Sequence, residues 1–170
     1  MSDRIATTDR LFLRRLVPED APFIVRLLNE PAFLEYIGDK GVRDLDDAVR
    51  YLQEGPLAMY AKHGHGLYGV ALKESGELIG ISGLLHRDEY EDIDLGYAFL
   101  AEHRGGGYAS EAGAAVLRVA SEVIGARKVI ALVAPANGAS IRVLEKLGFR
   151  PSTVPPAKPD TIVFERTFED

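Results

Sequence analysis

The sequence contains no cysteine. That absence excludes disulfide bonds, thiolate metal sites and a cysteine nucleophile together. No apolar run approaches the roughly 18 residues that a membrane-spanning helix needs, and the opening segment MSDRIATTDR has no apolar core of the signal-peptide type. The sequence therefore predicts a cytoplasmic protein without a membrane partner.

Positive charge is also in short supply. Lys and Arg number 20 against 26 Asp and Glu, which gives a formal net charge of −6 at pH 7, and no basic block occurs. Because nucleic-acid-binding surfaces gather cations on one face, a nucleic-acid partner is not expected. The single metal-like pattern is His63-Gly64-His65-Gly66, and its histidines have no third ligand in evident sequence register. It favours a loop, so no metal is predicted.

The 170-residue length favours a single domain over residues 1–170 with a substantial core. Apolar periodicity and the positions of proline and glycine predict the element order βααβββαβαββ, an α/β (α+β) arrangement in which an antiparallel meander runs into a parallel pair. The segment 31–42 is expected to be irregular. The expected strands cover 10–16, 67–73, 78–85, 93–100, 128–134, a segment from 149, and 160–168, and the expected helices start near 18 and 44, after the glycines at 105–107, and near 139.

The chain is organised around the stretch Asp94–Glu111, DLGYAFLAEHRGGGYASE. Its pattern indicates a strand, a charged turn, three consecutive glycines and the first turn of a helix. Glycine adopts positive φ readily and lets a ligand approach the backbone closely. Unpaired amides and the helix dipole at a helix N-terminus favour an anion. The stretch therefore indicates a phosphate or pyrophosphate site, with a flexible glycine turn as the alternative.

Two common phosphate loops do not fit this stretch. A nucleoside-triphosphate loop needs Lys followed by Ser or Thr after the last glycine, where Tyr108 and Ala109 stand, and a dinucleotide fingerprint needs a third glycine at Ser110. The segment 104–109, RGGGYA, instead resembles the [Gln/Arg]-x-x-Gly-x-[Gly/Ala] acetyl-CoA loop of the GNAT superfamily of N-acetyltransferases. In that motif Gly107 is the fixed glycine, and Gly105 occupies an unconstrained position.

Two further segments resemble the same family. Residues 137–149, NGASIRVLEKLGF, are similar to its N-x-x-[Ala/Ser]-x-x-x-[Tyr/Leu]-E-K-x-G-F segment, and 78–84, LIGISGL, to its third-strand signature. Ser140 and Leu144 point to the Rim-type branch of ribosomal-protein N-terminal acetyltransferases. The resemblance implies a single GNAT acetyltransferase domain, built on a mixed twisted sheet of six to seven strands with helices on both faces. It also implies acetyl-CoA as cosubstrate.

The resemblance implies a path for that cosubstrate. The strands 93–100 and 128–134 are expected to splay apart, so that the pantetheine arm is added to an open sheet edge. A backbone N–H of the first of these strands then stabilises the developing oxyanion. Arg104 and the following amides take the pyrophosphate, and Asn137 fixes pantetheine or a catalytic water. The expected cofactor-binding residues are Ala98, Phe99, Leu100, Arg104, Gly105, Gly106, Gly107, Tyr108, Ala109, Ser110, Asn137 and Ser140.

Acyl transfer to an amine needs a base for the ammonium and a proton for the departing thiolate. The resemblance places Asp94 at the position of the family's carboxylate, with a water relay because aspartate is shorter than the usual glutamate. A structural ion pair at the start of a strand is the alternative role. Leu144 replaces the tyrosine that many members use as the acid. Ser140 on the same helix is therefore the candidate acid, with a helix cap or a bond to the CoA sulfur as alternatives.

The predicted function is N-acetyl transfer from acetyl-CoA to a primary amine, by direct attack in a ternary complex. The amine belongs to a protein N-terminus or a small molecule, and it is expected to enter between the segments 30–42, 86–92 and 152–159. The acidic residues of 86–92 either attract a cationic amine or form a solvated turn. A non-catalytic acyl-CoA-binding or sensing module and a mononucleotide-binding enzyme are the alternatives. The family resemblance makes a homodimer a candidate assembly.

Overall fold

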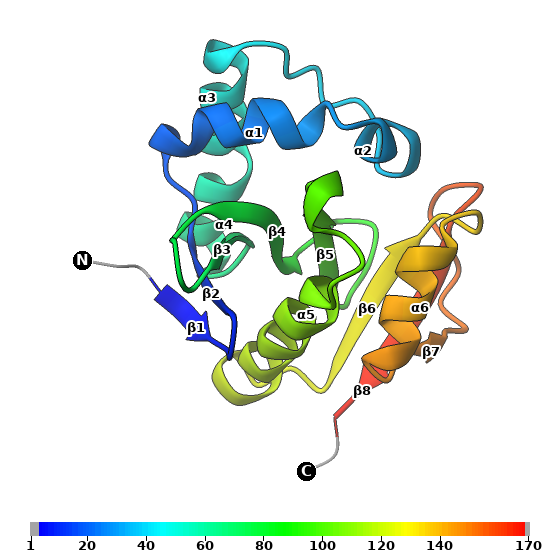
Figure 1. Ribbon diagram of the computed structural model, residues 1–170. Coiled ribbons are helices and arrows are strands. Elements are labelled where there is room, and N and C mark those ends of the chain that lie inside the picture. The colour runs from blue at the N-terminus through cyan, green and yellow to red at the C-terminus, as the bar shows by residue number, and fades with distance from the viewer. Residues whose placement is uncertain (1–3, 169–170) are drawn as a thin grey trace.

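The computed structural model describes residues 4–168. Its strands form one mixed sheet in the order β1-β2-β3-β4-β5-β6-β8-β7 (Figure 1). Strands β5 and β6 are parallel, and the other neighbours are antiparallel. This arrangement confirms the predicted fold class. The strands are β1 (Arg4–Thr7), β2 (Leu11–Arg15), β3 (Leu67–Leu72), β4 (Leu78–Leu85), β5 (Asp94–Phe99), β6 (Lys128–Val133), β7 (Arg150–Pro151) and β8 (Ile162–Thr167).

Helices cover both faces of the sheet. On one face, α1 and α3 bury Leu27 and Leu52 against Ile81 of β4. On the other face, α5 and α6 pack Val116 and Leu144 into the larger core. Within residues 4–168, no helix is both long enough and apolar enough to cross a membrane. The helical segments are η1 (Pro18–Asp20), α1 (Ala21–Leu28), α2 (Pro31–Tyr36), α3 (Leu45–Glu54), α4 (Pro56–His63), η2 (Ala101–His103), α5 (Tyr108–Arg118), η3 (Val119–Ile124) and α6 (Gly138–Lys146).

The sheet is larger than the sequence predicted. It has eight strands, where six to seven were expected. The additional strand is β1, which pairs antiparallel with β2 through partners such as Ala6 and Leu13. Its four residues, RIAT, are too short to show a periodic pattern, so tertiary pairing rather than local sequence defines this strand.

Two helices were not predicted. The segment expected to be irregular contains α2, and α4 occupies the stretch between α3 and β3. Pro31 and Pro56 lie at the first positions of these helices, where proline's missing N–H costs nothing and its fixed φ suits the helix. Each proline therefore begins a helix, and Pro31 does so at the start of the segment that was expected to be irregular.

The histidine pattern belongs to the end of α4. Gly64 has φ 77° and ends that helix, and His65 is buried with Nδ1 2.9 Å from the carbonyl oxygen of Leu84. Among the described residues, no group of three or more His, Cys, Asp or Glu side chains is placed to hold a metal ion. The pattern therefore has a local structural role, in turning the chain from α4 into β3.

Candidate active site

Strands β5 and β6 pair at one position. Their register joins Asp94 to Ile130, and the Ile130 amide donates to the Ile93 carbonyl at 3.0 Å. Beyond this pair the strands diverge, as Figure 1 shows for the green and yellow arrows at the centre of the molecule. The predicted separation of these two strands is confirmed, and it leaves an edge of β5 open.

The pairing of β5 with β4 decides which backbone groups face that open edge. The Leu100 amide donates to the Ile79 carbonyl, at 2.9 Å, on the β4 side. Because successive residues of a strand direct their backbone groups to opposite sides, Ala98 also faces β4, whereas Tyr97 and Phe99 face the gap. Of the three backbone positions expected to bind pantetheine, the structure turns Phe99 towards β6 and adds Tyr97.

A cavity of about 960 Å³ extends from this gap. Its wall combines β5, the end of β6, the glycine loop and the first turns of α5 and α6 with α2 and the segments that precede β5 and β8. Leu100 is 1% exposed in the core beside α1 and does not line the cavity, nor does Gly106. The expected site residues that line it are Asp94, Ala98, Phe99, Arg104, Gly105, Gly107, Tyr108, Ala109, Ser110, Asn137 and Ser140.

The glycine loop has the predicted geometry of a turn into a helix. Gly107 has φ 85° and immediately precedes α5, and Gly105 has φ 84°. The first amides of α5 border the cavity, where unpaired N–H groups and the helix dipole suit an anion. Glu111, in the same turn, accepts from Arg10 Nε at 2.7 Å, and the Arg10 guanidinium lies over the Tyr108 ring. The loop is thus braced by the residue that precedes β2.

Arg104 has a structural partner as well as a place in the cavity wall. Its Nε and Nη2 atoms donate to the Phe99 carbonyl at 3.1 and 2.8 Å, and Nη2 lies 3.1 Å from Glu30 Oε1. Glu30 in turn accepts the Ala101 amide at 2.6 Å. Arg104 therefore fixes the end of β5 while it places positive charge beside the glycine loop.

Asp94 combines both roles considered for it. Its side chain is almost fully buried and lines the cavity, and Oδ2 accepts from Arg87 Nε at 2.7 Å. Burial raises the pKa of Asp94, and the neighbouring Arg87 charge opposes that rise. The ion pair is real, and it leaves a desolvated carboxylate at the cavity surface.

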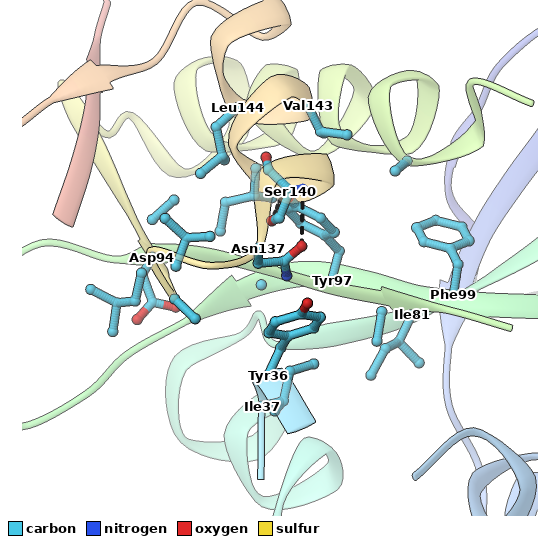
Figure 2. A pocket seen from close by; sticks show the side chains of 18 of the residues that line it. Tyr36, Ile37, Ile81, Asp94, Tyr97, Phe99, Asn137, Ser140, Val143 and Leu144 are labelled. Carbon is cyan, nitrogen blue, oxygen red and sulfur yellow. Dashed lines mark hydrogen bonds between the residues drawn. The ribbon is translucent and has the colours of Figure 1, made fainter. Parts of the chain in front are cut away.

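Two hydroxyls meet at the start of α6, one from Ser140 of that helix and one from Tyr97 of β5 (Figure 2). Asn137 Oδ1 caps the helix by accepting the Ser140 amide at 3.2 Å. Ser140 Oγ lies 2.6 Å from the Tyr97 hydroxyl, which also donates to the Ser140 carbonyl at 3.2 Å. Burial raises the pKa of Tyr97, although the bond to Ser140 opposes the shift, so the phenol holds its proton at neutral pH.

Helix α2 supplies the facing wall. Figure 2 shows Tyr36 and Ile37 across the cavity from α6, with the Tyr36 hydroxyl directed towards Asn137. Sequence reasoning missed a side-chain role for Tyr97. Its partner Ser140 lies 43 positions away, and no local pattern marks such a contact.

A protein-family model described as an acetyltransferase (GNAT) domain matches residues 10–150. The chain belongs to the GNAT acetyltransferases. It is an acetyl-CoA-dependent N-acetyltransferase, as the resemblance predicted.

Similar proteins extend over nearly the whole GNAT chain. The uncharacterized N-acetyltransferase YoaA of Bacillus subtilis is 29% identical over 147 residues, which cover 86% of this chain and 82% of YoaA. The crystal structure of an acetyltransferase from Agrobacterium tumefaciens str. C58 has a TM-score of 0.84 at 29% identity, and the match covers 96% of this chain and 94% of that one. A putative ribosomal-protein-serine acetyltransferase from Vibrio cholerae, with a TM-score of 0.78 at 20% identity and coverage of 98% and 99%, shares the fold.

The position at which the family resemblance leads one to expect a tyrosine as the acid is occupied by Leu144. Leu144 is buried in the cavity wall one turn beyond Ser140 on α6. The Tyr97 hydroxyl, which extends from β5, contacts α6 at Ser140, one turn before Leu144. The structure thus brings a phenol close to the position that the sequence left without one.

Proposed function

We propose that this GNAT enzyme transfers the acetyl group of acetyl-CoA to a primary amine by direct attack in a ternary complex. One observation supports this most strongly: a single cavity joins the open edge of β5, the N-terminus of α5 and the Asp94 carboxylate. Ser140 and Leu144 support the Rim-type branch, whose acceptors are protein N-termini. A small-molecule amine fits the same cavity, so the proposal includes both acceptors.

In this proposal the pantetheine arm extends the sheet along β5. The Phe99 N–H and the Tyr97 carbonyl, which face the gap, supply its hydrogen bonds, as in strand addition to a sheet edge, while the Phe99 carbonyl keeps its bonds to Arg104. The pyrophosphate lies against Gly107 and the first amides of α5, beside the Arg104 charge. Asn137 lies between these parts and holds the start of α6 in place.

The amine nitrogen forms a bond to the thioester carbonyl carbon, and the carbon–sulfur bond then breaks. The Tyr97 N–H stabilises the oxyanion between these events. Asp94 takes the ammonium proton through a water, because its carboxylate is buried and held by Arg87. The Tyr97–Ser140 hydroxyl pair returns a proton to the thiolate, and burial keeps the Tyr97 phenol protonated, so that this proton is present when the thiolate departs.

The first test measures binding and turnover separately. CoA is expected to raise the melting temperature by several degrees, since ligand at 100 times Kd stabilises the native state by about 2.7 kcal/mol. Acetyl-CoA with a panel of primary amines is expected to release free thiol. No melting shift near ~1 mM CoA would remove the cosubstrate from the proposal. A shift without thiol release from any amine would contradict the transfer and favour a binding module.

Replacing Tyr97 with phenylalanine tests the proton donor. The ring packing is retained and the hydroxyl contacts with Ser140 are lost, so kcat should fall by about 100-fold, the lower end of the range for acid–base groups. Ser140→Ala should lower kcat less, because the phenol remains. CoA-induced stabilisation should be unchanged in both variants. Tyr68→Phe, a buried tyrosine outside the cavity, is the matched control. A Tyr97→Phe enzyme with parental kcat assigns the proton to solvent.

A further inference from the structure

Three basic side chains meet on the cavity wall away from the glycine loop. They are Lys40 after α2, Arg87 between β4 and β5, and Lys158 between β7 and β8. Three segments far apart in the sequence therefore deliver positive charge to one mouth. The acidic residues of the segment 86–92 had suggested attraction of a cationic amine. The same segment also places the cation Arg87 in the cavity wall, beside Asp94.

These cations lie close enough to influence one another. The Lys40 side chain is largely exposed, yet the surrounding protein desolvates its ammonium and lowers its pKa, and the charges of Arg87 and Lys158 lower it further. Like charges held together destabilise a surface unless an anion joins them. These three cations therefore favour a negative group bound among them.

Among the described residues, carboxylates pair with only part of this cationic group. Within residues 4–168, neither Lys40 nor Lys158 has a hydrogen bond or ion pair, and Arg87 uses its Nε for Asp94. Its two terminal amino groups have no described partner in that range. The site that faces the acceptor thus offers free donors of the kind that bind carboxylates strongly.

Negative groups border the same mouth. Glu89 and Asp160 line the cavity with Asp94, so the mouth as a whole does not favour a simple anion. Charges of both signs at a short separation fit a zwitterion, with its ammonium near the carboxylates and its own carboxylate near the cations. Asp94 and Arg87, joined at 2.7 Å, lie where these two requirements meet.

The loop that carries Lys158 is held in place. The Ala157 amide donates to the Tyr90 hydroxyl at 2.7 Å, which joins this loop to the segment before β5. Tyr90 is 8% exposed and packs with Ile130 and Val163. The backbone next to Lys158 is therefore anchored.

We propose that the acceptor is a small amino carboxylate, such as a free amino acid. Its amine lies at Asp94, and its carboxylate lies at Lys40, Arg87 and Lys158. This inference rests on the proposed acetyl transfer and names the substrate class of the same cavity. A protein N-terminus, whose first carbonyl is an amide, lacks the carboxylate that the three cations select.

Paired acceptors test this selection. Free-thiol release is measured with amino acids, with their amides, with the corresponding decarboxylated amines, and with peptides that begin with an acidic residue. We expect kcat/KM for the best amino acid to exceed that for its amide about tenfold or more. The double variant Lys40→Gln/Lys158→Gln should lower kcat/KM for the amino acid by about 10- to 100-fold and lower that for the amide far less. Lys62→Gln removes an exposed lysine outside the cavity and is the matched control.

Each outcome decides between distinct conclusions. Amides or simple amines acetylated as well as amino acids overturn the carboxylate site and leave the acetyl transfer intact. Peptides acetylated in place of free amino acids overturn it in favour of a protein acceptor. A double variant that loses activity on all acceptors alike assigns the lysines a general electrostatic role. No thiol release with any amine contradicts the proposed function itself.

Discussion

Replacing Gly107 with valine is expected to abolish detectable CoA binding in calorimetry while the protein still folds. Gly107 has φ 85° immediately before α5, a conformation that a β-branched residue adopts only with strain. The new side chain would also press on Arg10 Nη2, 3.4 Å from the added Cβ, and so disturb the contacts of Arg10 that hold the first turn of α5. The backbone strain costs about 1–3 kcal/mol, less than the usual ~5–15 kcal/mol stability of a domain.

The matched control for this variant is Gly106→Ala. Gly106 does not have positive φ, and a Cβ there would make an ordinary contact with the Tyr108 ring at 3.4 Å. Gly105, which the motif leaves unconstrained, is a poor control because its φ of 84° is as strained for other residues as that of Gly107. If Gly107→Val binds CoA like the parent and Gly106→Ala does not, the phosphate lies elsewhere in the loop.

Replacing Asp94 with asparagine is expected to lower kcat/KM by about 10²- to 10⁴-fold below the pKa of the acceptor amine. Near and above that pKa the amine is already neutral, so the difference from the parent should narrow. Melting shifts with CoA should be retained, since Asp94 lies at the closed end of the β5–β6 gap. Asp88→Asn, an exposed carboxylate in the same segment, is the control. The relevant range is about pH 6 to 9, which lies below the pKa of ~10 of a free alkyl amine. Parental turnover across this range would assign deprotonation to another group.

The raised pKa of Asp94 sets the sign of two pH effects. The activity of the parent enzyme should fall on acidification, with a midpoint above ~3.9, the pKa of an ordinary aspartate. For folding, the neutral form is favoured in the native state, so the contribution to stability is fully present below ~3.9 and is lost as the pH rises through the raised pKa. Asp94→Asn should abolish the second dependence, which thermal unfolding as a function of pH would show.

Local signals predicted much of this fold. The strand at 78–85 coincides with β4, and Asp44 caps α3 by accepting the Asp47 amide at 2.8 Å. The three glycines and the helix start that we propose to bind an anion depend on residues that are adjacent in sequence, and for that reason they were identifiable. Helical spacing from Val116 and Ala120 would place Val123 on the buried face of the helix after the loop, but this side chain is 77% exposed. The wider turn η3 changes the angular phase after Val119, and such a change has no sequence signature.

The contacts that build the site were less accessible to sequence reasoning. Tyr97 and Ser140 meet across 43 positions of the chain. Whether Ala98 or Phe99 directs its backbone into the gap depends on the pairing of β5 with β4, because strand periodicity fixes alternation but not its phase relative to a neighbour. Arg87 belongs to a charged connection whose composition alone suggested solvent exposure, and its ion pair with Asp94 required tertiary structure.

The single pair that joins β5 to β6 has a consequence for how this protein resists unfolding. Along the rest of that edge, β5 and β6 do not form the backbone hydrogen bonds that usually join two parallel strands. The backbone groups of β5 that remain available there are those proposed to bind the cosubstrate. The bound cosubstrate would therefore use the backbone groups that otherwise would join the two halves of the sheet, and it would link these halves itself. In a cell, the protein with bound cosubstrate is therefore expected to resist unfolding and degradation better than the free protein.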